Sequence, residues 1–243
     1  MGGILTDLLS WEWIFWVNVP VGVAAFVLSP ILLRESREAH GQSHDVPGAV
    51  LVTAGLSALV LAITQGYGWG WGSATTIGTF IAAAALLVGF VFWEQRQSEP
   101  LVPFSIFRLQ TLTAANIAGF IMGTALFSMF LMLTLYMQQV LGYSPIETGL
   151  AYLAVAGTAV IWANVAAVAV NRVGVKPALI FGMSLLTIGL LYFTQVSVDG
   201  SYRADLFPGF LVLGLAIPFA FVPITIAALA GTKPQEAGLA SGL

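Results

Sequence analysis

The sequence predicts an all-α protein, a polytopic transmembrane bundle of about seven helices, on three observations. Only 8% of the residues are charged and 58% are hydrophobic, with a mean hydropathy of +0.94. A soluble domain needs far more charge to cover its surface. Seven stretches are apolar over about 20 residues, the length that lets a helix cross a hydrocarbon core about 30 Å thick. Arginine and lysine are concentrated in alternate gaps between these stretches.

The seven apolar stretches have no charged residue in their middle. They are too long and too uniform for the strands of a membrane barrel, which alternate over about ten residues. A helix satisfies its own backbone amides, as the lipid interior requires, and is therefore the predicted element. The predicted spans are 13–33, 47–66, 75–93, 112–139, 149–170, 176–196 and 207–230.

The positive charges predict an orientation, because cytoplasmic loops of membrane proteins are enriched in arginine and lysine. One set of gaps, with the C-terminal tail, holds seven of the eight basic residues: Arg34, Arg37, Arg96, Arg108, Arg172, Lys176 and Lys233. The opposite set holds only Arg203. The first helix is therefore expected to run from outside to inside, and the tail is expected to be cytoplasmic, in a multi-pass protein of the plasma (inner) membrane.

The loops fit this topology. The stretch 67–72 is a short outer turn with aromatic rings suited to the membrane interface, and it lacks the lysine and flanking strand of a phosphate loop. The inner linker 34–46 contains His40, His44 and Asp45, whose spacing is open to a metal site. A solvated linker is the favoured interpretation, and no metal is predicted.

Composition also argues against several classes of function. The chain has no cysteine, so no disulfide or thiolate metal site is expected. With a pI near 5.2 and no basic patch, no nucleic-acid partner is expected. No cluster of histidine and acidic residues and no serine triad accompanies a span, so we predict no enzyme, no catalytic residue and no cofactor.

Several runs at the ends of the spans resemble those of the major facilitator superfamily, most closely its fourteen-helix drug:proton antiporter branch. Residues 2–7, 10–15 and 18–22 resemble the junction of that family's helices five and six, although Glu12 stands where a basic residue is usual. The most specific run is 136–145, followed by Gly149 and Leu150. Further matches, in the expected order, are 100–103, 106–108, 171–174 and 238–243.

The resemblance implies that the chain covers about helices six to twelve of a partial major facilitator fold, as a fragment of a longer gene product. Residues 1–33 would end the N-terminal half, and 34–46 would be a cytoplasmic linker. Residues 47–93 would be the two extra helices between the halves, 94–111 a cytoplasmic loop, and 112–243 a partial C-terminal half. The implied function is proton-coupled efflux of lipophilic drugs or other small molecules by alternating access. Its partners would be the lipid bilayer, a small-molecule substrate and, in the intact protein, protons.

Proton coupling commonly uses an ionisable group inside the membrane, and the middle of no span has one. Uncharged amides are the remaining candidates for a substrate cavity, although interhelical hydrogen bonding is the commoner role of such groups. Asn116 lies about one turn into the fourth span and is the best cavity candidate. Gln138 and Gln139 lie near its outer end, where they could instead line an external vestibule.

Two further pairs are candidates for gating. Pro218 and Pro223 remove backbone donors within the last span, where a kink or partial opening is expected. Asn171 and Arg172 occupy the inner loop that, in the family, biases the inward–outward equilibrium through charge pairs. Asn171 replaces the usual aspartate, so a weaker latch is implied. Anchoring of topology by Arg172 and Lys176 is the simpler alternative.

Other classes of protein share the layout of seven helices with an outer N-terminus. A heptahelical receptor or a retinal protein is one alternative, and a non-functional truncated transporter is another. A retinal protein needs a lysine in mid-membrane for its Schiff base, but Lys176 and Lys233 lie at span ends. The cysteine pair common in receptors is also absent.

Overall fold

The structure is a computed structural model and describes residues 2–32, 45–97 and 100–230. All regular secondary structure in these ranges is helical, so the predicted fold class is confirmed. Seven helical segments of the described chain are long and apolar enough to cross a membrane, as predicted. They are Trp13–Leu32, Val46–Trp69, Ala74–Glu94, Gln110–Val140, Pro145–Val173, Val175–Phe193 and Tyr202–Leu229.

The described residues divide into two compact units. One consists of 2–32 with 110–230, and the other of 45–97 with 100–109. Each is described by itself. The boundaries that the resemblance implies for the halves and the linker stay a prediction, and most of the linker 34–46 lies outside the described residues.

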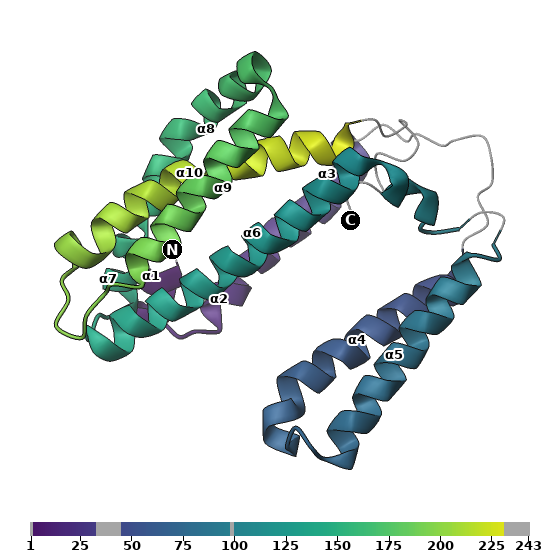
Figure 1. The fold of residues 1–243 in the computed structure, drawn as a ribbon. Helices are drawn as coiled ribbons and strands as arrows, with labels where there is room; N and C mark the ends of the chain where they lie inside the picture. Colours follow the sequence, from purple (N-terminus) through teal and green to yellow (C-terminus); the bar gives the residue numbers. More distant parts are fainter. Residues whose placement is uncertain (1, 33–44, 98–99, 231–243) are drawn as a thin grey trace. The chain divides into compact units, whose positions relative to one another are not determined.

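The smaller unit is an antiparallel hairpin of α4 (Val46–Trp69) and α5 (Ala74–Glu94) (Figure 1). Its buried positions repeat every seven residues on both helices: Gly48, Gly55 and Ala62 on α4, and Thr76, Ala83 and Phe90 on α5. A seven-residue repeat keeps one seam facing the partner when two helices wrap around each other with a left-handed twist. Small residues in the seam allow close approach, since a Cβ on Gly55 would lie 2.8 Å from Cδ2 of Leu87.

The turn between α4 and α5, which is the outer end of the hairpin on the predicted orientation, is fastened by a short polar network. Ser73 caps α5 by accepting a hydrogen bond from the Thr76 amide at 3.2 Å. The buried Thr76 hydroxyl donates to the Gly70 carbonyl at 2.9 Å. The Trp71 ring lies against Gly66, where a Cβ would come within 2.6 Å of the ring. Tyr67 is exposed at this turn, as expected of an interfacial ring.

The inner end of the hairpin is organised by two carboxylates. Asp45 caps α4 by accepting from the Gly48 amide at 3.0 Å, and it also accepts from the Trp93 indole at 2.8 Å. Glu94 is buried and accepts from the Leu101 and Val102 amides, each at 3.1 Å. The loop thereby folds back on α5 and continues into the short helix η1 (Phe104–Arg108).

The larger unit is built around α10 (Phe207–Leu229), the most buried helix of the described chain. It packs against α6 (Gln110–Leu135), α8 (Leu153–Val173) and α9 (Val175–Phe193) (Figure 1). Short elements complete its outer end: η2 (Tyr136–Val140), α7 (Pro145–Ala151) and η3 (Tyr202–Leu206). Because α10 contacts all three long neighbours, it positions them relative to one another.

Glycine sets the closest approaches of α10 to its neighbours. A Cβ on Gly182 of α9 would lie 2.5 Å from the Ala220 amide nitrogen, and one on Gly214 of α10 would lie 2.6 Å from the Val155 carbonyl oxygen of α8. Backbone can meet backbone this closely only where no side chain intervenes. On α6, by contrast, the residues facing the core include Met122, Met129 and Met137. These buried methionines fill irregular space, so packing is the role that the structure supports for them.

The N-terminal helices belong to the same unit. They are α1 (Gly2–Leu8), α2 (Trp13–Trp16) and α3 (Asn18–Leu32). Only α1 packs closely on the rest, against α7, where a Cβ on Gly3 would collide with the Pro145 carbonyl. No residue of α2 or α3 is buried.

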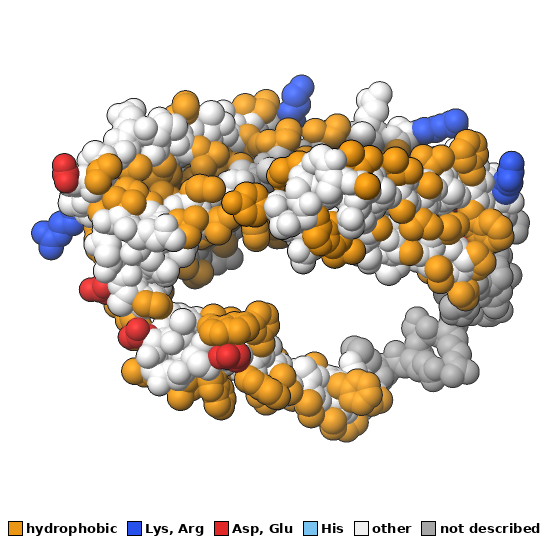
Figure 2. Space-filling model, turned by 90° about the horizontal axis from the view of Figure 1, so that it is seen from below, with side chains coloured by type: hydrophobic (Ala, Val, Ile, Leu, Met, Phe, Trp, Pro, Cys, Tyr) orange, Lys and Arg blue, Asp and Glu red, His pale blue; other side chains and the backbone are white. Residues whose placement is uncertain are grey.

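The sides of the helices are strongly hydrophobic. Hydrophobic side chains cover much of the face shown in Figure 2, and large exposed examples include Phe26, Phe120, Phe127 and Val160. Water would penalise such a surface heavily, whereas lipid does not. The chain is therefore a multi-pass membrane protein by composition, length and surface alike.

The close contact at Gly182 yields a stability prediction. A Gly182→Ala change places a methyl group against the α10 backbone, which cannot move aside as a flexible side chain can. We expect it to lower the unfolding free energy in detergent by about 1 to 3 kcal/mol, as overpacking does. The measurement is thermal unfolding followed by circular dichroism.

The matched control is Gly157→Ala on α8, where a Cβ meets nothing within 4 Å. This change should leave stability unaltered or slightly raised, because alanine favours helix over glycine. Equal behaviour of the two variants would contradict the proposed close packing of α9 on α10.

Candidate functional site

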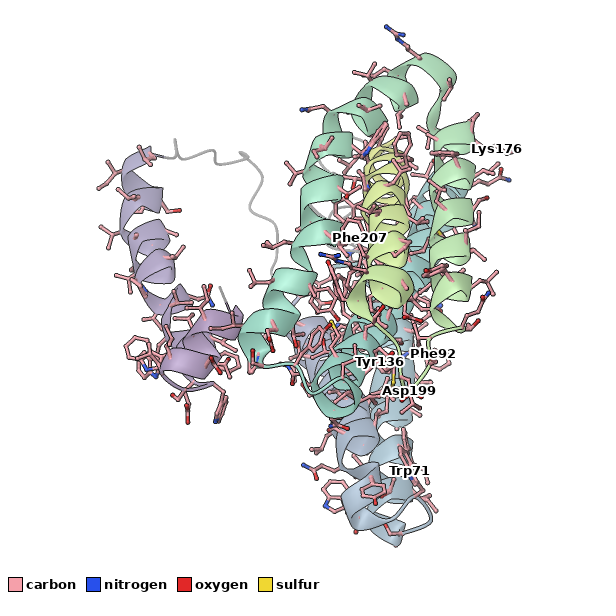
Figure 3. The ribbon with its side chains drawn as sticks, turned by 90° about the vertical axis from the view of Figure 1, so that its left-hand side faces the viewer. Trp71, Phe92, Tyr136, Lys176, Asp199 and Phe207 are labelled. Carbon is pink, nitrogen blue, oxygen red and sulfur yellow. The ribbon has the colours of Figure 1, made fainter. Side chains whose placement is uncertain are left out.

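Five of the six tyrosines gather at one end of the larger unit: Tyr136, Tyr143, Tyr152, Tyr192 and Tyr202. This is the outer end if the positive charges mark the cytoplasmic side. Figure 3 shows Tyr136 and Asp199 at this end, with Lys176 at the other. Tyrosine favours the membrane interface, since its ring is apolar and its hydroxyl needs a polar partner.

Four of these hydroxyls donate to backbone carbonyls of neighbouring segments. Tyr152 bonds the Phe130 carbonyl of α6 at 2.9 Å, and its hydroxyl also lies 3.0 Å from the Thr134 hydroxyl. Tyr136 bonds the Ser197 carbonyl at 2.6 Å, Tyr202 bonds the Ala151 carbonyl at 3.0 Å, and Tyr192 bonds that of Ala204. Every long helix of this bundle is thus tied to another segment at the outer end.

Two π-helical segments lie within the same region. In η2 and η3 the backbone widens by one residue per turn, an arrangement often found at functional sites. Each begins with one of the bonded tyrosines, Tyr136 or Tyr202. The predicted residues Gln138 and Gln139 lie in η2, and both are exposed. Their placement fits an external vestibule better than a mid-membrane cavity.

Asn116 is separated from these glutamines. It lies on α6 one and a half turns after the inner start of the helix and is half-buried. A rise of about 1.5 Å per residue puts it roughly 33 Å from Gln138 along the helix. Its side chain forms no hydrogen bond within the described part of the chain. The three predicted amides therefore do not form one site, and Asn116 alone lies well within the span.

The two prolines of α10 are both buried, and the helix is continuous through them. A proline at position i leaves the carbonyl of residue i−4 without its helical donor, here those of Gly214 and Phe219. These two residues are the points where α10 meets α8 and α9 most closely. The expected opening of the helix is not seen. Instead, the α10 carbonyls that lack a helical hydrogen bond belong to residues that α8 and α9 approach closely.

Asn171 and Arg172 end α8 and are both exposed. The turn to α9 consists of Gly174, whose φ of +90° is a conformation that glycine adopts readily. Within the described residues Arg172 has no acidic partner within ion-pair distance. The charge latch implied by the resemblance stays a prediction, and within the described chain the short turn joins α8 to α9.

Two carboxylates at helix ends of the hairpin unit accept hydrogen bonds. Glu94 accepts hydrogen bonds from two loop amides. Asp45 accepts from the Gly48 amide, which it caps, and from the Trp93 indole. Glu12 is exposed beside the first span, and a hydrogen bond from Ser10 holds its pKa below the usual value. No metal-binding group of three was found among the described residues, and His40 and His44 lie outside them.

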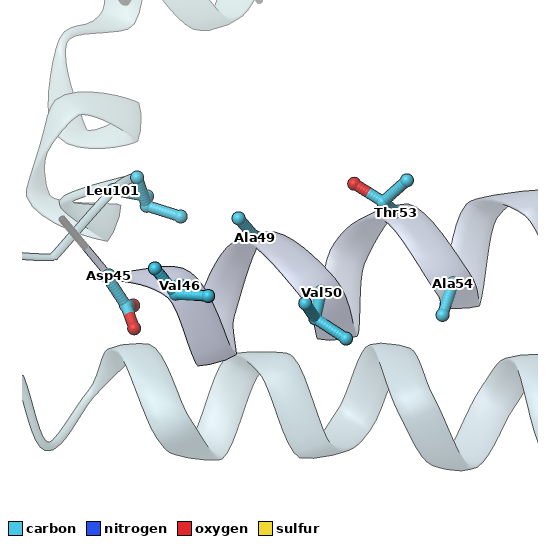
Figure 4. A pocket seen from close by; sticks show the side chains of 7 residues that line it. All are labelled: Asp45, Val46, Ala49, Val50, Thr53, Ala54 and Leu101. Carbon is cyan, nitrogen blue, oxygen red and sulfur yellow. The ribbon is translucent and has the colours of Figure 1, made fainter.

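An apolar groove runs along α4 within the hairpin unit (Figure 4). It has a volume of about 560 Å³ and is lined by Asp45, Val46, Ala49, Val50, Thr53, Ala54 and Leu101. The Asp45 carboxyl turns toward α5, where Trp93 donates to it. The groove therefore offers almost only hydrocarbon surface.

The family model of the Major Facilitator Superfamily matches residues 1–243 of the chain. The chain belongs to the major facilitator superfamily. The resemblance noted in the sequence is thereby confirmed, and the receptor-like alternative is not favoured.

Relatives within the superfamily include resistance and export proteins. The tetracenomycin C resistance and export protein of Streptomyces glaucescens is 33% identical over 100% of this chain and 45% of its own length. The lincomycin resistance protein of Streptomyces lincolnensis is 30% identical over 100% of this chain and 50% of its own. The multidrug transporter protein MdtP of Bacillus subtilis is 28% identical over 97% and 43%. The chain spans about half the length of the curated relatives it matches.

Sequence reasoning missed the bonded tyrosines of this superfamily member. The signal was present, because tyrosines recur at or near the predicted outer boundaries of four spans. Their partners are backbone carbonyls, however, and carry no mark in the sequence. A search of the sequence for complementary side-chain pairs therefore could not find these hydrogen bonds.

A Tyr152→Phe change tests the tyrosine contacts. It removes the hydroxyl shared by Phe130 and Thr134 while keeping the ring against Phe210. We expect a loss of about 1 kcal/mol in unfolding free energy, the usual scale for an interhelical hydrogen bond in a membrane protein. Chemical unfolding in mixed micelles measures it. Tyr67→Phe, at an 89% exposed tyrosine, serves as the control and should change nothing.

Proposed function

We propose that the whole protein exports lipophilic small molecules across the plasma membrane by alternating access, driven by proton antiport. The support is membership of the superfamily together with similarity to resistance and export proteins over the full chain. On this proposal the chain supplies helices six to twelve of a fourteen-helix antiporter, preceded by the end of helix five.

The observation that carries the mechanism is the contact of α1 with α7. On the proposed assignment α1 ends the first half of the transporter and α7 begins a helix of the second. Gly3 lies against the Pro145 carbonyl, with the Gly149 position also close. Such a contact closes the outer end without interlocking side chains. Outward opening requires the two backbones to separate, and the Gly3 side of this contact has no side chain to obstruct the separation.

Helix α10 supports movement within the second half. Alternating access requires helices to shift without exposing unpaired amides to lipid. Proline has no amide hydrogen, so bending at Pro218 or Pro223 breaks no bond that the helix had formed there. The Phe219 carbonyl faces Gly182 of α9, and Gly214 faces Thr158 and the Val155 carbonyl of α8, so at each contact one partner has no side chain to obstruct a small shift. We therefore assign both prolines to gating.

The remaining predicted residues take more limited roles. Asn116 is proposed to face the substrate pathway, and Gln138 and Gln139 to line its outer mouth. Asn171 and Arg172 are proposed to influence the inner end, and the positive charges of Arg172 and Lys176 support a cytoplasmic position for that end. We assign the proton-carrying group to no residue of the described helices.

The test of function is efflux from a drug-hypersensitive bacterium that expresses the complete reading frame containing this chain. Cells should retain several-fold less of a lipophilic fluorescent dye than cells with an empty vector. A protonophore should abolish the difference, because antiport draws on the proton gradient. Equal dye retention with and without the gene would refute export, and efflux that survives the protonophore would refute proton coupling.

Gating by α10 is tested with Pro223→Ala in the same frame. Alanine restores the amide that can bond the Phe219 carbonyl, so the helix should stiffen and the efflux rate should fall severalfold at unchanged expression. Slower hydrogen exchange of the amides near 223 would report the stiffening directly. Pro208→Ala, in the first turn of α10 where no helical bond is lost, is the control and should transport normally.

A further inference from the structure

A small cleft opens at the outer end of the larger unit. Its volume is about 340 Å³, and it is lined by Tyr143, Glu147, Leu150, Ala151 and Tyr202. These residues come from the segment before α7, from α7 itself and from the start of η3. They combine two aromatic rings, one carboxylate and an apolar wall.

The carboxylate of Glu147 is held in place. Ser144 and Glu147 form a capping box in which Oε2 of Glu147 accepts from the Ser144 amide at 2.8 Å and the Ser144 hydroxyl accepts from the Glu147 amide at 3.2 Å. The other oxygen, Oε1, makes no hydrogen bond within the described chain. No described lysine or arginine forms an ion pair with Glu147 either. An oriented, exposed negative charge thus borders the cleft without a positive partner.

The ring of Tyr202 and the backbone of Tyr143 are also held in place. Tyr202 is anchored by its bond to the Ala151 carbonyl and by ring contacts with Phe207 and Phe210, whose centroids lie 5.8 and 6.2 Å away. Tyr143 follows Gly142, whose φ of +71° turns the chain, and its amide bonds the Met137 carbonyl at 2.9 Å. Aromatic faces attract cations, and they do so more strongly when ring position is set in advance.

The third wall is apolar. Leu150 is 58% exposed beside the carboxylate, and Ala151 forms the floor. A small metal ion or a simple anion would gain nothing from such a wall, and an anion would be repelled by Glu147. A carboxylate, two aromatic rings and an apolar wall together favour an organic cation that carries apolar groups around its charge.

We propose that this cleft binds a lipophilic organic cation of the quaternary ammonium or phosphonium class. Its charge would lie near Oε1 of Glu147 and the faces of Tyr143 and Tyr202, and its apolar groups would lie on Leu150. The role of this site rests on the proposed function, because the cleft would be an outer binding site at the end of the transport path. The binding itself is independent of transport and is measured separately.

The experiment uses the purified chain in a non-ionic detergent with tetraphenylphosphonium as the probe, and equilibrium dialysis as the readout. Saturable binding is expected. Glu147→Gln should weaken it at least about fivefold, because the charge is lost while glutamine still serves the capping box. Tyr143→Leu should weaken it to a similar extent, and Tyr143→Phe should retain it. Circular dichroism confirms that each variant keeps its helices.

Asp199→Asn is the matched control. Asp199 is an exposed carboxylate of the same outer end that does not line the cleft. Its removal should leave binding unchanged. Equal weakening by Asp199→Asn and Glu147→Gln would show only a general charge effect and overturn the site, as would full binding by Glu147→Gln.

A choline lipid headgroup shares the chemistry of the probe, so a second arm separates the two sources. The dialysis is repeated in nanodiscs of phosphatidylglycerol and of phosphatidylcholine. The ratio of wild-type to Glu147→Gln affinity is compared, because an anionic surface concentrates the cation equally for both proteins. An equal ratio in the two lipids supports a free cation as the ligand, whereas a ratio near one only in phosphatidylcholine identifies a lipid headgroup at the same cleft. Binding that depends on Glu147 without cellular efflux would support the site and refute the proposed function. Efflux without that dependence would do the reverse.

Discussion

Lipid offers no hydrogen bonds, and the architecture of this chain follows from that constraint. Each span must satisfy its own amides, so the sequence uses helices and ends them with caps such as Asp45 and Ser73. Apolar burial cannot drive helices together in such a solvent, because lipid is as apolar as leucine. Association must come from close backbone contact and from polar bonds between helices. Both devices are present in the larger unit: the close contacts of Gly182 and Gly214 lie along α9 and α10, and the tyrosine bonds lie at the end of the bundle that holds α7.

This separation has a mechanical consequence. Glycine contacts are short in range but have little directional preference, so two helices can slide or tilt across them. Tyrosine–carbonyl bonds are directional and resist the same motion. The second-half helices are thus expected to be stiff at the tyrosine end and more compliant around Gly182 and Gly214, where Pro218 and Pro223 have also removed helical bonds. A helix hinged in mid-membrane and fixed at its outer end can change the shape of a cavity without dissolving the bundle.

The sequence was sufficient for the fold class, the seven spans and the family, since each depends on composition, on length or on local runs of residues. The predicted spans differ from the observed ones by no more than a few residues at most ends. The candidate site was less accessible. Asn116 and Gln138 share a helix and were grouped by residue type, yet the rise of the helix places them at different depths. The bonds of Tyr152 and Tyr202 end on backbone carbonyls, which every residue possesses and no sequence pattern marks.

The same limit explains why the sequence predicted only part of the effect of the two prolines in α10. Their positions predict lost bonds, but whether a helix opens there depends on what surrounds it. In α10 both prolines are buried, and Gly182 lets α9 approach the very carbonyl that Pro223 leaves free. Close packing on both sides then holds the helix continuous, although one bond is missing at each step. A helix that lacks internal bonds and is kept continuous by its neighbours responds when those neighbours move. Coupling between α8, α9 and α10 is therefore a property of the packed bundle and of no single residue.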